Sequence, residues 1–185
     1  MYTALSGATM PIDHGHRLDA AQLPTPSALL RAFLGTDHPD PTRHRVLDAA
    51  RDLASCHDRR RRALEQARDP AASSSTGAAC GRLVDDIDND RVALIAHIDE
   101  WVATHVEHRV GASLHTETLG AVIDRMAAKW IAAQQAMAGP APTKTTPRQR
   151  EARTHLQWCR LAELTDGYRD LITDVTEHRR RLPVW

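Results

Sequence analysis

The stretch SLHTETLGAVIDRM, residues 113–126, gathers ionisable side chains at the start of an otherwise apolar helical pattern. Glu117 and Asp124 lie seven residues apart, so on a helix their carboxylates stack on one line, roughly opposite the apolar side. Stacked carboxylates need cationic or metal partners if they are buried, and need none if they are exposed. Arg125 is adjacent to Asp124, so each must pair elsewhere. His115 precedes the regular turns, where it either leans toward the core or acts in a cap.

Three more polar residues lie on the apolar lines of predicted helices: His57, Arg91 and His105. An inward histidine is usually a core residue with satisfied hydrogen bonds. Three such residues on two helices, with another histidine at the head of a third helix, favour a shared polar pocket. There the arginines would bind an anion or pair with Asp124, and the histidines would donate hydrogen bonds. The candidate ligand-binding cluster is His57, Arg91, His105, His115, Glu117, Asp124 and Arg125.

Two stretches rich in acids and histidines, VDDIDND and HIDEWVATHVEH, raise the alternative of a metal-dependent hydrolase. Helical bundles hold divalent metals with inward carboxylates and histidines, typically as a Glu-x-x-His pair. Here His97 and Glu100 have the reversed spacing and lie off the apolar line, and Asp85 and Asp88 are similarly peripheral. The acids are more typical of a solvated helix N-terminal region. We therefore expect no metal ligands and no cofactor.

Motifs for nucleophilic catalysis or nucleotide binding are absent: there is no Gly-x-Ser-x-Gly and no Gly-rich phosphate loop. The basic run from Arg59 to Arg62 is balanced by Asp58 and Glu65, as on a solvated helix face. Lysine and arginine together number 24, as do aspartate and glutamate, which removes a general attraction to nucleic acid or anionic membranes. We expect a protein without enzymatic activity, and no catalytic residue is assigned.

Helical periodicity occurs in five segments, and alternating strand patterns are absent. A short helix follows Thr25 and ends at Gly35, with Pro26 at its first position. Four long helices are predicted, over about 42–69, 83–109, 113–137 and 147–183. The predicted fold is all-α: one antiparallel four-helix-bundle-like domain over residues 23–183, with a short extra N-terminal helix. Loops are expected near 70–81 and 138–146, and a flexible segment over 1–22.

Small residues lie on and beside the line of Glu117 and Asp124. Ala121 and Ala128 are on that line, with Gly120 and Ala127 next to it. Such residues let another backbone approach closely, so this face either closes a homodimer or packs within the chain against the short N-terminal helix.

Cys56, Cys80 and Cys159 are odd in number and widely separated, which favours reduced thiols over a disulfide framework or a zinc site. The N-terminal sequence lacks the features of a secretory signal, and no apolar run reaches the roughly 18 residues of a membrane span. We expect a soluble, cytoplasmic chain without membrane contact.

The segments LHTETLGAVIDRM and RLAELTDGYRDLITDVTEHRRRLP resemble a bacterial, mainly actinobacterial, all-helical family of unknown function. In that family a His-Thr-Glu-Thr-x-Gly motif followed by Asp-Arg heads a helix. The matching positions are His115, Thr116, Glu117, Thr118, Gly120, Val122, Ile123, Asp124 and Arg125. The resemblance implies an all-helical fold and singles out the positions of the motif, but it implies no activity. Some members lie in operons with glycosyltransferases, which implies a link to surface carbohydrate assembly.

These observations predict a helical binding or accessory module of unknown ligand, whose partner is another protein or a second copy of the chain. The alternative is a metal-dependent hydrolase with a carboxylate and histidine site inside the bundle.

Overall fold

The computed structural model describes residues 22–35, 44–138 and 146–183. The segment expected to be flexible, 1–22, therefore lies outside the described residues except for Gln22, as does most of the loop expected at 138–146. The described elements, in chain order, are α1 (Pro26–Leu34), α2 (Arg45–Ala67), α3 (Ser74–His105), β1 (Ser113–Leu114), α4 (Leu119–Ala138), α5 (Pro147–Thr176) and β2 (Arg180–Arg181). The protein is mostly helical, which confirms the all-α class.

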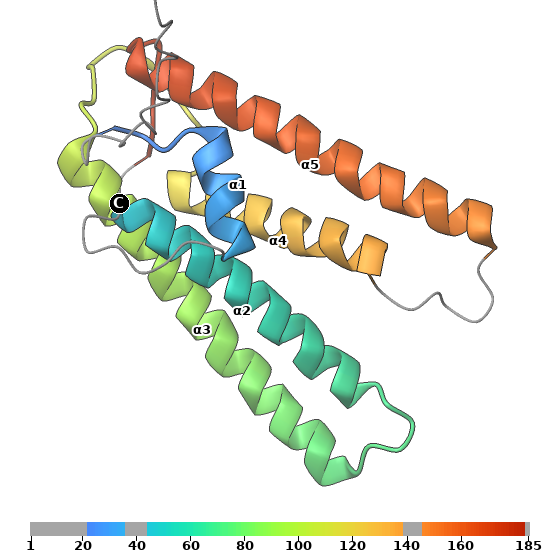
Figure 1. Ribbon diagram of the computed structural model, residues 1–185. Helices are drawn as coiled ribbons and strands as arrows, with labels where there is room; N and C mark the ends of the chain where they lie inside the picture. The colour runs from blue at the N-terminus through green and yellow to red at the C-terminus, as the bar shows by residue number, and fades with distance from the viewer. Residues whose placement is uncertain (1–21, 36–43, 139–145, 184–185) are drawn as a thin grey trace, which may run out of the picture.

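The four long helices run in alternating directions along the chain (Figure 1). α2 and α3 form an antiparallel hairpin, and α4 packs on both of them. α5 lies antiparallel to α4, with the ring of Trp158 6.0 Å from that of Trp130 and edge-on to it. α5 contacts α4, α1 and β2, but within the described residues it contacts neither α2 nor α3. A closed four-helix bundle is therefore not confirmed, because α5 covers only the outer side of α4.

The short helix α1 fills the place that a closed bundle would give to α5. Leu29 and Phe33 of α1 are buried, and Phe33 lies 6.3 Å from Trp130, centroid to centroid. Tyr168 of α5 donates a hydrogen bond to the carbonyl of Pro24 at 2.8 Å, which ties the start of the described chain to α5. The core therefore spans α1 to α5 and also includes Leu182 after β2.

Two helix starts differ from the sequence prediction: a capping side chain sets the start of α3, and a short strand delays the start of α4. α3 begins at Ser74, not near 83, so most of the loop expected at 70–81 is helical. The Ser73 side chain accepts a hydrogen bond from the Thr76 amide there, and the following alanines favour the helix. α4 begins at Leu119, because residues 113–114 form β1 instead of a helical turn.

The strands β1 and β2, which the periodicity did not predict, are a two-residue parallel pair. The amide of His115 donates to the carbonyl of Arg181 at 2.9 Å. His178 just after α5 has a φ of 56°, a left-handed conformation that ends the helix so that β2 can lie beside β1. This pairing fixes the chain segment that precedes α4.

No helix in the described part of the chain is long and apolar enough to cross a membrane.

Candidate functional site

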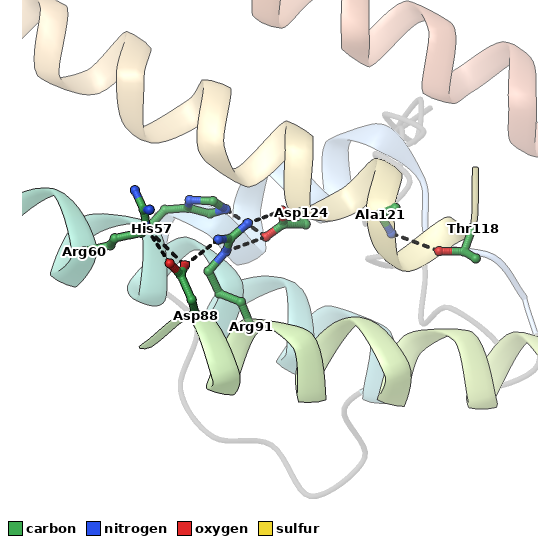
Figure 2. A network of polar contacts seen from close by, with 7 residues as sticks. All are labelled: His57, Arg60, Asp88, Arg91, Thr118, Ala121 and Asp124. Carbon is green, nitrogen blue, oxygen red and sulfur yellow. Dashed lines mark hydrogen bonds and ion pairs between the residues drawn. The ribbon is translucent and has the colours of Figure 1, made fainter. Parts of the chain in front are cut away.

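Five ionisable side chains from α2, α3 and α4 form one connected group, here called the polar network (Figure 2). Its centre is the Asp124 carboxylate on α4. Arg91 of α3 contacts both of its oxygens, with Nε 3.1 Å from Oδ1 and Nη2 2.7 Å from Oδ2. His57 Nε2 of α2 lies 2.8 Å from the same Oδ1. Asp88 accepts from Arg91 Nη1 at 2.7 Å and from Arg60 Nε at 3.0 Å. The polar network therefore joins three helices.

Buried neighbours on α2 and α3 show that His57 and Arg91 point inward. His57 lies four residues after buried Leu53, and Arg91 four residues after buried Ile87, and residues with this spacing share a helix face. The side chains of His57 and Asp124 are each 13% exposed. Of the two cases that the sequence left open for Asp124, the structure has the buried one with cationic partners, because α2 and α3 cover the side of α4 that α5 leaves open.

The charges of the polar network balance within the chain. Burial alone raises the pKa of Asp124, but the hydrogen bonds from His57 and Arg91, with their charges, outweigh it and lower that pKa below its usual range. The pKa of Asp88 is lowered in the same way, since its hydrogen bonds to Arg91 and Arg60 outweigh burial. Every nitrogen of the Arg91 guanidinium donates to a carboxylate. An added anion would have to displace one of these carboxylates.

Thr118 and Gly120, two positions of the sequence motif, form the N-terminal cap of α4. Thr118 Oγ1 accepts from the Ala121 amide at 3.2 Å (Figure 2), and the Gly120 amide donates to Asp99 Oδ1 of α3 at 2.8 Å. A Cβ at Gly120 would lie 2.6 Å from the carbonyl oxygen of Ile95. Glycine is therefore required where α3 and α4 touch. Burial raises the pKa of Asp99, although the hydrogen bonds from Gly120 and Thr118 partly oppose the shift.

This contact shows where the small-residue face of α4 is used within the chain. Gly120 and Ala127 are buried, whereas Ala121 and Ala128 remain half-buried. A homodimer through Ala121 and Ala128 stays a prediction.

Four of the seven predicted cluster residues lie outside the polar network. Arg125 Nη1 donates to Glu117 Oε1 at 2.8 Å, in a pair whose side chains are 44% and 38% exposed. His115 Nδ1 lies 2.8 Å from the carbonyl oxygen of Glu117 and 3.2 Å from its amide nitrogen, contacts that stabilise the turn before α4. His105, which was predicted to lie inward, is exposed and stacks on Trp101, with ring centroids 4.8 Å apart. The structure thus brings together His57, Arg91 and Asp124 only.

His44 is a structural histidine that the sequence reasoning missed. Its Nδ1 accepts from the Val46 amide at 3.3 Å, which caps α2, and its Nε2 lies 2.8 Å from the carbonyl oxygen of Gln22. The ring also packs on Trp101, with centroids 4.7 Å apart. Burial lowers the pKa of His44, and the nearby His105 lowers it further. Histidine is not a usual N-cap residue, so the capping pattern gave no signal here.

The acid-rich stretches do not form a metal centre in the described residues, where no group of three or more His, Cys, Asp or Glu side chains could hold an ion. Asp88 belongs to the polar network, and Asp90 lies 3.6 Å from Arg59 in an exposed pair. Of the thiols, Cys56 and Cys80 are buried. Cys159 is half-buried, and its Sγ lies 3.4 Å from His155 Nε2 on the same helix.

A groove of about 960 Å³ lies between the end of α4 and the first turns of α5. Its apolar lining includes Met137, whose exposed fraction is 52%, and Trp158. Arg148, Arg150 and His155 of α5 add polar groups to it. We call this the α4–α5 groove. It lies far along α4 from Asp124, so it is separate from the polar network.

A family described as "Protein of unknown function (DUF4254)" matches residues 47–184, which include α2 to α5 and both strands. No curated protein and no solved structure matches the chain.

Proposed function

The chain belongs to DUF4254, a family of proteins of unknown function, and we propose that it is a non-enzymatic helical interaction module that binds a second copy of itself through the start of α5. The observation that carries this proposal is the apolar α4–α5 groove, next to which large hydrophobic side chains remain exposed. The charged groups of the polar network are joined in ion pairs inside the chain, so we assign it to holding α2, α3 and α4 in register.

Apolar surface at this end of the molecule supplies the driving force. Met137 is 52% exposed in the groove, and Leu156 on the neighbouring face of α5 is 46% exposed. Ala152, which also lines the groove, is exposed as well. Covering such side chains gains about 25 cal/mol for each Å² removed from water, so a partner that buries them would stabilise the contact.

The charges of α5 favour an antiparallel second copy as the partner. The first turn of α5 contains no acid, although a helix N-terminus favours negative charge and disfavours cations. Arg148 in that turn makes no ion pair with any described residue. Asp166 lies about five helical turns further on, hence on the same side of the helix. Within the chain it already pairs with Arg169 at 2.5 Å, in an exposed ion pair that a second cation could share. A two-fold axis level with Gln157 would place Arg148 beside Asp166 of the second copy, and symmetry would form this pair twice.

An accessory role in surface carbohydrate assembly, which the resemblance implied, is compatible with a self-associating module, and we keep it as part of the proposal. A hydrolase is not proposed, since no geometry in the described residues favours it.

Sedimentation equilibrium tests the proposal. We expect a concentration-dependent dimer for the native chain and a dissociation constant raised by at least about tenfold in Leu156→Glu, equivalent to about 1.4 kcal/mol. Val110→Glu is the matched control, because Val110 is 97% exposed but lies in the loop after α3. Exchanging the charges tests the proposed Arg148–Asp166 pair directly. Arg148→Asp alone should weaken the dimer, and the double variant with Asp166→Arg should restore it. A native chain that stays monomeric at about 100 µM, or equal effects of the two glutamates, would contradict the proposal.

A further inference from the structure

His155 and Cys159 form a pair of metal-ligand side chains on the outward face of α5. They are one helical turn apart, and Cys159 Sγ lies 3.4 Å from His155 Nε2. His155 is exposed and Cys159 half-buried. The pair lies at the edge of the α4–α5 groove, whose lining includes His155. It plays no part in the core or in the polar network.

The separation of the two donor atoms fits a zinc ion. Zinc binds thiolate sulfur at about 2.3 Å and imidazole nitrogen at about 2.0–2.1 Å, so two tetrahedral ligands of these types lie about 3.5 Å apart. The observed 3.4 Å is close to that value. The thiol–imidazole contact therefore holds the two donor atoms at nearly the separation that an ion would need.

One copy of the chain supplies only half of a structural zinc site. Such sites take four protein ligands, whereas the described residues offer no third His, Cys, Asp or Glu at this place. The two-fold axis that would pair Arg148 with Asp166 passes level with Gln157, midway between His155 and Cys159. The same axis would bring the two pairs of donors around one point.

We propose that His155 and Cys159 of two copies together bind one Zn²⁺-class ion as a Cys₂His₂ site at the centre of the α5–α5 contact. This inference rests on the proposed self-association and names what completes it. Mixed thiolate and imidazole ligands in tetrahedral geometry select zinc over harder ions such as Mg²⁺ or Ca²⁺. Each Cys159 thiol loses its proton to solvent as its sulfur binds the metal, so binding weakens in acid.

Titration of the full chain with Co²⁺ under reducing conditions tests the site, because Co²⁺ occupies zinc sites and a tetrahedral thiolate complex absorbs visible and near-ultraviolet light. We expect these bands to saturate at one Co²⁺ for two chains, to disappear on adding Zn²⁺, and to be absent in Cys159→Ser and His155→Ala. Cys80→Ala is the control for the thiol, since Cys80 is buried, and should keep the bands. Sedimentation of the same samples should show a dimer that the metal tightens by at least tenfold.

The inference fails if the bands do not appear, if they survive Cys159→Ser, or if they saturate at one ion for each chain in a monomer. Failure of the metal site is distinguishable from failure of the proposed function. A dimer that is equally strong in the presence of a chelator and in Cys159→Ser, but is weakened by Leu156→Glu, removes the metal and leaves the self-association. A chain that is monomeric both with and without zinc contradicts the metal site and the self-association alike.

Discussion

Asp124→Asn removes the charge on which α2, α3 and α4 converge while it keeps the shape of the side chain. Arg91 would lose its ionic partner on α4 and would face an amide, and His57 would lose a charged acceptor. The Asp124 and Arg91 side chains are 13% and 22% exposed. Breaking a fully buried ion pair costs about 3–5 kcal/mol, and exposed pairs contribute about 0–1 kcal/mol. For this intermediate burial we expect a loss of about 2–3 kcal/mol in the free energy of unfolding.

The loss depends on pH in a direction fixed by the lowered pKa of Asp124. Burial raises this pKa, but the hydrogen bonds from His57 and Arg91 lower it further than burial raises it. A carboxyl whose folded pKa is lowered stabilises the fold fully above its ordinary value of about 3.9, and the contribution disappears as the pH falls through the folded value. The difference in the free energy of unfolding between wild type and Asp124→Asn should therefore be largest near neutral pH and should disappear in acid.

Urea and thermal unfolding, followed by circular dichroism, measure this difference. In a domain of this size, 2–3 kcal/mol lowers the melting temperature by roughly 5–10 °C. Asp86→Asn is the control, because Asp86 is exposed on the same helix as Arg91, and it should change the free energy of unfolding by less than about 0.5 kcal/mol. If Asp124→Asn is as stable as this control, or if its loss of stability persists unchanged in acid, the Asp124 ion pairs do not stabilise the fold.

Two further substitutions test the packing of the same elements. Gly120→Ala should lower the free energy of unfolding in urea by about 1–3 kcal/mol, because its Cβ would meet the carbonyl oxygen of Ile95. Gly167→Ala, where a Cβ meets nothing, should instead raise it by up to about 1 kcal/mol. The reverse order would mean that α3 and α4 are not in close contact. Tyr168→Phe should cost about 1–2 kcal/mol in the same assay, since it leaves the buried carbonyl of Pro24 without its donor, and a neutral result would show that α5 does not anchor the start of the described chain.

Helical periodicity was right for two of the three polar residues that it placed inward, whereas the third, His105, is exposed. It could not give the level at which the helices cross. His57 and Arg91 lie on the apolar lines of α2 and α3, and both were predicted to be inward. Asp124 looked outward on the helical wheel of α4 alone, because the wheel shows only one core direction, whereas α4 packs on α5 and on the α2–α3 hairpin. Glu117 and Arg125 share a motif with Asp124 but pair at the exposed start of α4.

Other parts of the site depend on contacts that no single helix encodes. Asp88 and Arg60 each look solvated on their own helix and become partners only when α2 lies beside α3. Gly120 could be marked as a place for close approach, but the approaching element, α3, could not be named. The bundle prediction had the right number and direction of long helices, yet the position of α5 depends on α1 filling the core beside α4.

Native mass spectrometry of the protein as purified, with the metal content measured on the same sample, tests the central claim of self-association most directly. We expect the mass of two chains, with one zinc-class ion for each pair, and a shift to single chains in Leu156→Glu. A dimer mass without metal would keep the interaction module and refute the His155–Cys159 site. A monomer at every concentration, with Leu156→Glu indistinguishable from the native chain, would show that the protein does not self-associate through α5.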